Sequence, residues 1–240
     1  MAKFRQFLAK PAVTAVLLVL AVALLGSGGV GSARAALNQY SEYYDSEVVL
    51  PEIDVTLLEN GQAVSGSDVL LNNVLSSGEK LHPGKKYDLT NSEKLTVYNS
   101  GSIEAIVRVT VQQYWKNPNG EKAPLMKAEW IDLGLGGAGW TIDGASTTKE
   151  RTVLYYDSFL PPGGETASFL KSITVNSDVT KKVTQTNDGN GKITTTYDYN
   201  GYQMCIRVKV DAVQTHNAAD AVKSAWGKSV TVSGSSITLN

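Results

Sequence analysis

Short segments in which apolar and polar side chains alternate follow one another along most of the chain, separated by turn residues. In the stretch EIDVTLLENGQAV, Ile53, Val55 and Leu57 fall on one face of an extended backbone. Because successive side chains of a strand point to opposite faces, this period of two predicts a half-buried strand. Asn60 and Gly61 tolerate the positive φ angles of a tight hairpin turn, so a second strand is expected directly after them.

The stretch KLTVYNSGSIEAIVRVTVQQYW predicts the most regular strand pair. Leu95 and Val97 alternate with polar neighbours, residues 99–102 supply a turn, and a second alternation begins after that turn. The inward positions of this second strand are Ala105, Val107, Val109 and Val111. Arg108 stands in the middle of the opposite set, which predicts a strand with one buried face and one solvated face.

The same pattern returns in shorter form further along the chain. Pro83 and Gly84 predict a turn, and residues 117–147 indicate glycine-rich short loops. Two strand-like runs flank a turn at 161–164, and residues 185–196 predict a polar loop or a protruding hairpin. The run YQMCIRVKVDAVQ restores strict alternation, with an inward set formed by Met204, Ile206, Val208 and Val210.

Near the C-terminus, the stretch NAADAVKSAWG predicts a helix. Asn217 stands at the N-cap position and Gly227 at the C-terminal cap. The apolar stripe between them consists of Ala218, Val222, Ala225 and Trp226. The stretch SVTVSGSSITL then predicts a closing strand pair. Residues 51–240 are therefore expected to form a single all-β domain, a jelly-roll-like β-sandwich of two antiparallel sheets with one short helix near the C-terminus.

Residues 1–35 have the layout of a secretory signal peptide. Lys3, Arg5 and Lys10 precede an apolar run from residue 13 to residue 25, and Ala33 and Ala35 form an A-x-A cleavage site. The run of 13 residues is shorter than the ~20 that a spanning helix needs. We therefore expect a signal peptidase to cut after Ala35, or alternatively after Ala36. This predicts a secreted product without a stable membrane anchor after cleavage.

The segment that follows, residues 36–50, belongs neither to the leader nor to the sandwich pattern. Its apolar and aromatic positions are Leu37, Tyr40, Tyr43, Tyr44, Val48 and Val49. Alone it has too little apolar area to offset the entropy of ordering it. As a strand, residues 37–50 would span about 46 Å at ~3.3 Å per residue. We expect a segment that is mobile in the monomer and is donated to the sheet edge of a neighbouring copy, a head-to-tail contact that builds a homopolymer.

Charge and cysteine content exclude several classes of protein. The leader holds four bases and no acids, so the mature chain has 22 − 4 = 18 bases against 23 acids, a net charge of −5. A nucleic-acid partner is not expected, because phosphate binding needs a clustered positive field. Cys205 is the lone cysteine, which excludes an internal disulfide framework. Its alternation predicts a buried small residue, and the alternative is a reactive thiol that links molecules.

Candidate residues for catalysis or metal binding are few. His82 and His216 are the two histidines, and neither H-E-x-x-H nor G-x-S-x-G occurs. His82 precedes a turn, where we expect a solvated side chain, and His216 lies just before the predicted helix. Most of the four tryptophans and eleven tyrosines are assigned to the core and to sheet faces rather than to a sugar platform. The chain is expected to have no catalytic residues, no metal and no cofactor.

The order of these motifs resembles the TasA/camelysin family of exported Gram-positive proteins. The similarity rests on the Ala-x-Ala-Ala-Leu-Asn leader end, EIDVTL, the block LHPGKK…LTVYNSGSIEAIVRVTV, and YYDSFLPPGGETASFLKSITV. Together with VKVDAVQTHNAADAVKSAWG, it is nearest to the clostridial BsaA-like matrix proteins, which depend on signal peptidase W. The resemblance implies a fibre-forming subunit of an extracellular biofilm matrix, at the cell surface or released. Two alternatives stay open, a secreted metalloprotease of the camelysin type and an adhesin for carbohydrate or a host surface.

The cleavage site yields a direct prediction. Secreted material should begin at Ala36 or Leu37, and blocking the cut should abolish assembly, because a tethered segment cannot reach a neighbour. Edman or mass-spectrometric analysis of the secreted N-terminus tests this. A first residue well beyond Tyr43 would contradict the assembly role, since most of the linking segment would be gone.

Overall fold

The computed structural model describes residues 52–64, 71, 74–75, 79–187, 189 and 193–240, together with five residues of the leader. The chain divides into two units, residues 1–49 and residues 50–240. Those five leader residues (12, 15, 16, 18 and 19) are helical, and no helix among the described residues combines the length and apolar character needed to cross a membrane. The predicted cleavage site at Ala33–Ala36 and the polymerisation segment up to Val49 lie outside the described residues.

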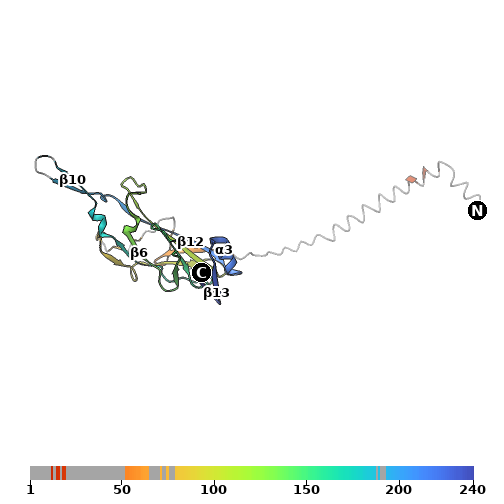
Figure 1. Ribbon diagram of the computed structural model, residues 1–240. Coiled ribbons are helices and arrows are strands. Elements are labelled where there is room, and N and C mark those ends of the chain that lie inside the picture. Colours follow the sequence, from red (N-terminus) through yellow and green to blue (C-terminus); the bar gives the residue numbers. More distant parts are fainter. Residues whose placement is uncertain are drawn as a thin grey trace, which may run out of the picture. The chain divides into compact units, whose positions relative to one another are not determined.

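The larger unit is an antiparallel β-sandwich (Figure 1). One layer is a four-stranded sheet in the order β12-β5-β8-β7, with β5 Ala105–Lys116, β7 Trp140–Ile142, β8 Arg151–Tyr156 and β12 Gln203–Gln214. The other layer has two three-stranded sheets. The first is β2-β1-β4, with β1 Val55–Glu59, β2 Gln62–Ala63 and β4 Leu95–Asn99. The second is β3-β9-β6, with β3 Lys86–Asp88, β6 Ile131–Leu135 and β9 Leu170–Val175.

The main core lies between these layers because each strand turns its apolar set inward. Val107, Val109 and Val111 of β5 meet Leu95 and Val97 of β4 and residues of β9, and all are at most 2% exposed. Full burial of such side chains contributes about 1.5–3 kcal/mol each. The predicted all-β sandwich is confirmed, as are the turns at Asn60–Gly61 and Pro83–Gly84.

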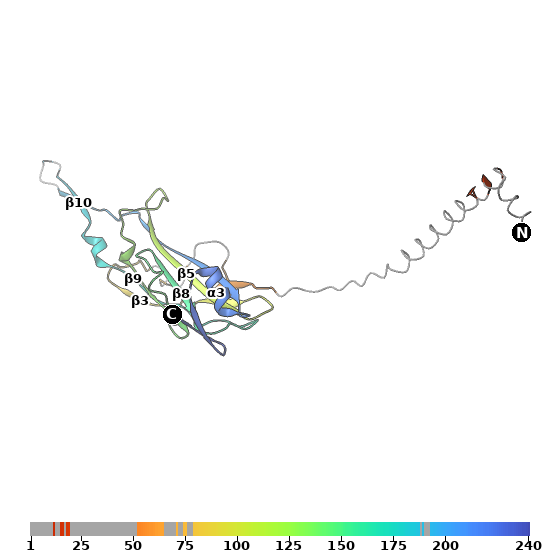
Figure 2. The ribbon, with the colours of Figure 1, turned by 45° about the vertical axis from the view of Figure 1, so that its right-hand side comes forward.

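Two hairpins and one helix complete the unit. The hairpin β10 Val183–Asn187 and β11 Ile193–Tyr197 is exposed along both strands and projects from the sandwich (Figures 1 and 2), which confirms the predicted protruding hairpin. Helix α3 Ala218–Trp226 and the closing pair β13 Val230–Ser233 and β14 Ser236–Leu239 also appear as predicted. Two short 3-10 helices, η1 Ala128–Trp130 and η2 Ser177–Lys181, lie in connections.

Helix α3 differs from the prediction in its cap and its stripe. Asn217 occupies the N-cap position in a left-handed conformation (φ 52°), and its side chain makes no capping hydrogen bond. Ala225 is exposed, whereas Ala218 and Val222 are buried against the sheet. The helix therefore uses a narrower apolar contact than the sequence indicates, with Gly227 as its C-terminal cap as expected.

The prediction that one face of β5 is exposed to solvent is wrong at one end of the strand. Ile106 is fully buried, because α3, β13 and β14 pack over it and form a second small core with Val222 and Ile237. Arg108, the charged residue on which the expectation rested, is itself only partly exposed. The C-terminal elements thus cover a face that an isolated strand pattern assigns to solvent.

The prediction of loops for residues 117–147 is also wrong in part, since β6 and β7 both lie there. Glycine weakens a strand pattern because it has no side chain to pack. In β6, Gly134 sits against Ser172 of β9 so closely that a Cβ atom would collide with the serine hydroxyl. Gly134 therefore weakens the strand pattern in the sequence, but its missing side chain is what allows β6 and β9 to lie this close together.

The turn between β4 and β5 joins several distant segments. Asn99 is fully buried, and its side-chain amide donates to the carbonyl oxygens of Ile103 and Leu160, each at 2.8 Å. Its Oδ1 accepts from the N–H of Gly101 at 3.0 Å. All these polar groups are therefore satisfied within the protein.

The same turn also binds residues 52–54, which connect the N-terminal segment to β1. The N–H groups of Gly101 and Ser102 donate to the carbonyl oxygens of Asp54 and Glu52 at 3.0 and 2.9 Å. A Cβ atom at Gly101 would lie 2.5 Å from the Glu52 oxygen and 2.6 Å from the Asp54 nitrogen. Only glycine permits this close approach.

Replacing the buried amide should be costly. Asn99→Ala removes three side-chain hydrogen bonds of about 1 kcal/mol each, so the free energy of unfolding should fall by about 3 kcal/mol. Asn119→Ala, at an exposed turn position, is the matched control and should change it by less than ~0.5 kcal/mol. Urea denaturation at constant m-value provides the measurement. Equal midpoints for Asn99→Ala and the wild type would show that the turn does not organise the fold.

Candidate functional site

The outer face of the four-stranded sheet carries a group of charged, amide and aromatic side chains. It is formed by the side chains that alternate with the core set, among them Arg108, Gln112 and Tyr114 of β5 and Arg207 and Lys209 of β12. At one end, α3 and the β13–β14 hairpin cover this face (Figure 2). Towards the other end it is hollowed, and no described helix or hairpin packs over it.

An ionic cluster lies at the border of the covered half. Arg108 and Asp211 are cross-strand partners, and Arg108 Nη2 lies 2.7 Å from Asp211 Oδ2. Lys209 Nζ reaches the other carboxylate oxygen at 2.7 Å. The indole ring of Trp226 stacks with the Arg108 guanidinium at 4.7 Å and meets the Tyr155 ring edge-on at 5.5 Å. The helix end is thereby fastened to the sheet through charge and aromatic contacts.

The carboxylates of Asp211, which is partly buried, and of Asp143, which is buried, are held ionised by their partners. Burial raises the pKa of Asp211, but hydrogen bonds from Lys209 and Arg108 outweigh it, and the net pKa lies below the ordinary 3.8. Burial likewise raises the pKa of Asp143, and the Lys228 ammonium at 2.8 Å with the Ser146 N–H more than offsets it, so the net pKa is lowered. Lys228 follows α3, so this second pair links the C-terminal elements to the β7–β8 connection.

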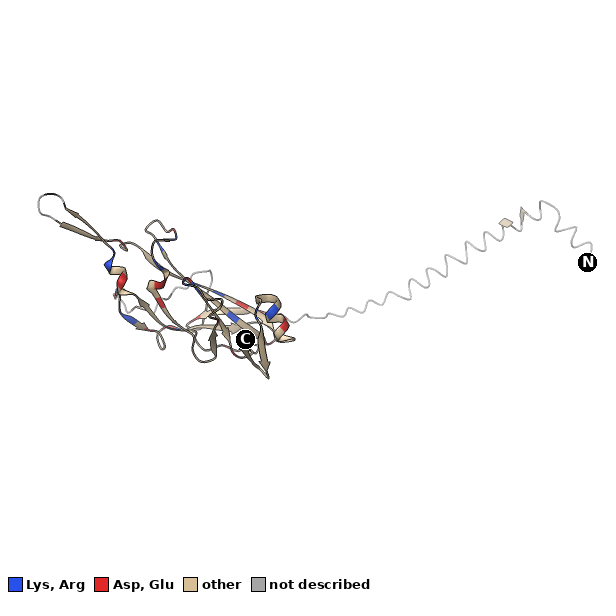
Figure 3. Cartoon of the chain, viewed as in Figure 1, with Lys and Arg blue, Asp and Glu red and all other residues tan. Residues whose placement is uncertain are grey.

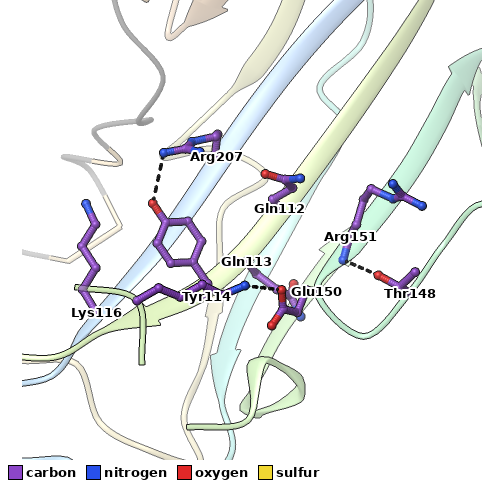
Figure 4. Close-up of a pocket in the computed structure, with 9 residues that line it drawn as sticks. Gln112, Gln113, Tyr114, Lys116, Thr148, Glu150, Arg151 and Arg207 are labelled. Atoms are coloured by element: carbon purple, nitrogen blue, oxygen red, sulfur yellow. Dashed lines mark hydrogen bonds and ion pairs between the residues drawn. The ribbon is translucent and has the colours of Figure 1, made fainter. Parts of the chain in front are cut away.

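The uncovered half contains a hollow of about 520 Å³, which we call the basic pocket (Figure 4). Its charged lining residues are Lys116, Lys122, Arg151, Arg207 and Glu150. Four bases and one acid give 4 − 1 = +3 in a chain whose predicted mature form is acidic. Its uncharged lining residues are Gln112, Gln113, Tyr114 and Thr148. Figure 3 shows how charged residues are spread along the rest of the ribbon.

Strand register assembles the basic pocket. Gln112 of β5 is the cross-strand partner of Arg207 on one side and of Arg151 on the other, so three long polar side chains form one row. Beside this row stands the Tyr114 ring, whose centroid lies 5.7 Å from the Arg207 guanidinium and 5.9 Å from Lys116 Nζ. At the other end of the pocket, Lys122 Nζ pairs with Glu150 at 2.6 Å.

A second hollow of about 420 Å³, the edge groove, lies along β12. Its apolar lining residues are Leu57, Val64, Val208 and Val210, and its polar lining residues are Thr110, Gln112, Arg207 and Lys209. In the described part of the chain, β12 pairs with β5 alone, so its outer edge has no strand partner there. The groove therefore combines apolar side chains with an unpaired strand edge of twelve residues.

The histidines, the tryptophans and Cys205 are the other candidate residues that the structure describes. His82 and His216 are both exposed, in keeping with the solvated role expected for His82. Across the ranges that the structure describes, no three His, Cys, Asp or Glu residues gather as a metal site would require. Trp115, Trp130 and Trp140 are buried as predicted. Cys205 is half-buried on the outer face opposite Tyr114, so the expectation of full burial is wrong.

Sequence reasoning missed the basic pocket. Arg207 and Lys209 are visible as an alternating basic set, but Arg151 lies some fifty residues away and enters the row only through the β5–β8 register. The chain matches no family model, no curated protein and no solved structure.

The ionic cluster gives a pH-dependent prediction. Asp211→Asn should lower the free energy of unfolding by about 2 kcal/mol at pH 7, because Arg108 and Lys209 lose their carboxylate. The folded pKa of Asp211 is lowered, so the wild-type advantage is present above the ordinary value of 3.8 and is lost as the pH falls through the folded pKa. Chemical denaturation from pH 7 to pH 2 measures this.

Asp132→Asn, at an exposed position of β6, is the control and should follow the wild type throughout. A deficit of Asp211→Asn that persists undiminished at pH 2 would show that packing, and not charge, is the origin of the effect.

Proposed function

We propose that this protein is a secreted structural subunit of an extracellular biofilm-matrix fibre. Subunits polymerise head to tail when residues 37–50 of one copy lie along β12 of the next. The observation that carries this proposal is the edge groove, where apolar side chains adjoin the outer edge of β12. The resemblance of the motifs to the TasA/camelysin family favours the same function.

The outer edge of β12 stands apart from the other sheet edges. The outer edge of β4 is already bonded by residues 163–169, where Thr166 N–H donates to the Val97 oxygen and Phe169 N–H to the Leu95 oxygen. The edge strands β2, β3 and β7 have two or three residues each, and β6 has five. β12 has twelve, and an outer edge of that length that pairs with no strand among the described residues is a template for another chain.

The dimensions of the proposed donor and acceptor agree. Fourteen residues from Leu37 to Leu50 face a twelve-residue strand, so a ladder along the whole of β12 leaves two residues for the connection. Backbone hydrogen bonds supply affinity in such strand addition, and pockets for alternate side chains supply selectivity. The apolar positions of the donor, such as Tyr44 and Val48, would lie against Val64 and Val208 in the groove.

The anchored start of the domain suits this arrangement. Glu52 is held at the β4–β5 turn by three hydrogen bonds with Ser102, in one of which the Glu52 N–H donates to the serine hydroxyl at 2.9 Å. The donor segment therefore begins from a fixed point, and tension along a fibre would pass through this turn into β4 and β5. Before cleavage the leader retains the segment at the membrane, which prevents assembly inside the cell.

Two changes test the proposal. Deleting residues 36–47 should give a folded monomer that forms no filaments, because the donor strand is lost. Val64→Arg should have the same effect by placing a charge in the acceptor groove, whereas Val232→Arg, at an exposed valine of β13, should polymerise normally. Negative-stain microscopy and sedimentation of the processed proteins measure assembly.

The two variants test different parts of the proposal. Filaments of normal length from the deletion variant would rule out residues 36–47 as the link. Filaments of normal length from Val64→Arg alone would place the acceptor somewhere other than the edge groove.

A further inference from the structure

The basic pocket concentrates positive charge on a protein that is predicted to be acidic after processing. Its net charge of +3 arises within one hollow on the outer face of the sheet, which shares Gln112 and Arg207 with the edge groove. Charges of one sign that are gathered in a concave site raise the local concentration of ligands of opposite sign. The pocket therefore selects for an anionic ligand.

The polar row defines which anion fits. Arg207 and Gln112 are exposed, and the guanidinium of Arg151 is oriented by donating from Nε and Nη2 to the Ser146 carbonyl oxygen at 3.3 and 3.1 Å. A guanidinium presents a planar fork of donors that matches a carboxylate in bidentate fashion. Gln112, between the two arginines, adds both donors and an acceptor suited to hydroxyl groups.

The remaining lining favours a saccharide over a peptide. Peptide strands gain selectivity from pockets for apolar side chains. The basic pocket is lined by charged, amide, hydroxyl and phenol side chains, with no aliphatic side chain. The Tyr114 ring offers an apolar surface with a polar tip, and the volume of about 520 Å³ lies within the range of small-ligand sites.

We infer that the basic pocket binds carboxylate-bearing sugar units, such as the uronates of an acidic polysaccharide. The Arg207 guanidinium receives the carboxylate, and Arg151, on the other side of Gln112, adds positive charge. Gln112 and Glu150 bond the hydroxyl groups, and Tyr114 lies against the ring. This inference does not depend on polymerisation, since the pocket is complete within one chain.

Calorimetric titration of the mature protein with trigalacturonate tests the inference. The double variant Arg151→Gln/Arg207→Gln should bind at least tenfold more weakly. Arg151→Gln alone, which leaves the edge groove unaltered, should bind at least threefold more weakly. The control Lys182→Gln/Lys223→Gln removes the same charge at two exposed positions outside the pocket and should bind within twofold of the wild type.

Three further probes separate the sources of an anion. Trigalactose, the uncharged counterpart, should not bind at the same concentrations, and triglutamate and tripolyphosphate should bind at least tenfold more weakly than trigalacturonate. Equal binding of trigalacturonate by the wild type and either pocket variant would overturn the inference. Binding of any of the three other probes as tightly as trigalacturonate would also overturn it, because charge or sugar alone would then suffice.

Discussion

The buried amide of Asn99 is the interaction on which the rest of the structure depends. One side chain, excluded from solvent, bonds two carbonyl groups and one N–H, at Gly101 and Ile103 of the turn and at Leu160. Because each of these hydrogen bonds contributes about 1 kcal/mol, the amide holds Leu160 against the turn. Gly101 then lets residues 52–54 pass against the turn at a distance that no side chain would allow. The start of the domain is thus fixed to the two strands at the centre of the sandwich.

The alternation of β5 and β12 gives the sheet two faces with different tasks. The inward valines build the main core. The side chains that alternate with them lie on the outer face, and their exposure depends on whether the C-terminal elements cover them. Under α3, Arg108 and Asp211 are paired and partly buried, and they fasten the helix to the sheet. Beyond the helix, Gln112 and Arg207 stay exposed and line the basic pocket. Stability and the proposed recognition of ligands therefore come from adjacent rungs of the same strands.

Local patterns in the sequence were sufficient where neighbours along the chain determine the structure. Period-two alternation located β4, β5 and β12, and Asn60–Gly61 located the first hairpin, because strand faces and tight turns are set by a few consecutive residues. The same patterns failed where contacts with distant segments determine the structure. Ile106 is buried by elements more than a hundred residues away, and Gly134 belongs to a strand because Ser172 approaches it. The basic pocket needs the register of three strands, which no single stretch of sequence contains.

The central feature of the proposed fibre is that residues 37–50 of each subunit complete the sheet of the next at β12. Cryo-electron microscopy of filaments assembled from the processed protein tests it most directly. We expect an additional strand hydrogen-bonded to the outer edge of β12, continuous with Glu52 of the preceding subunit and lying over Val64 and Val208. Filaments in which the outer edge of β12 faces solvent, or in which residues 37–50 return to their own subunit, would contradict it.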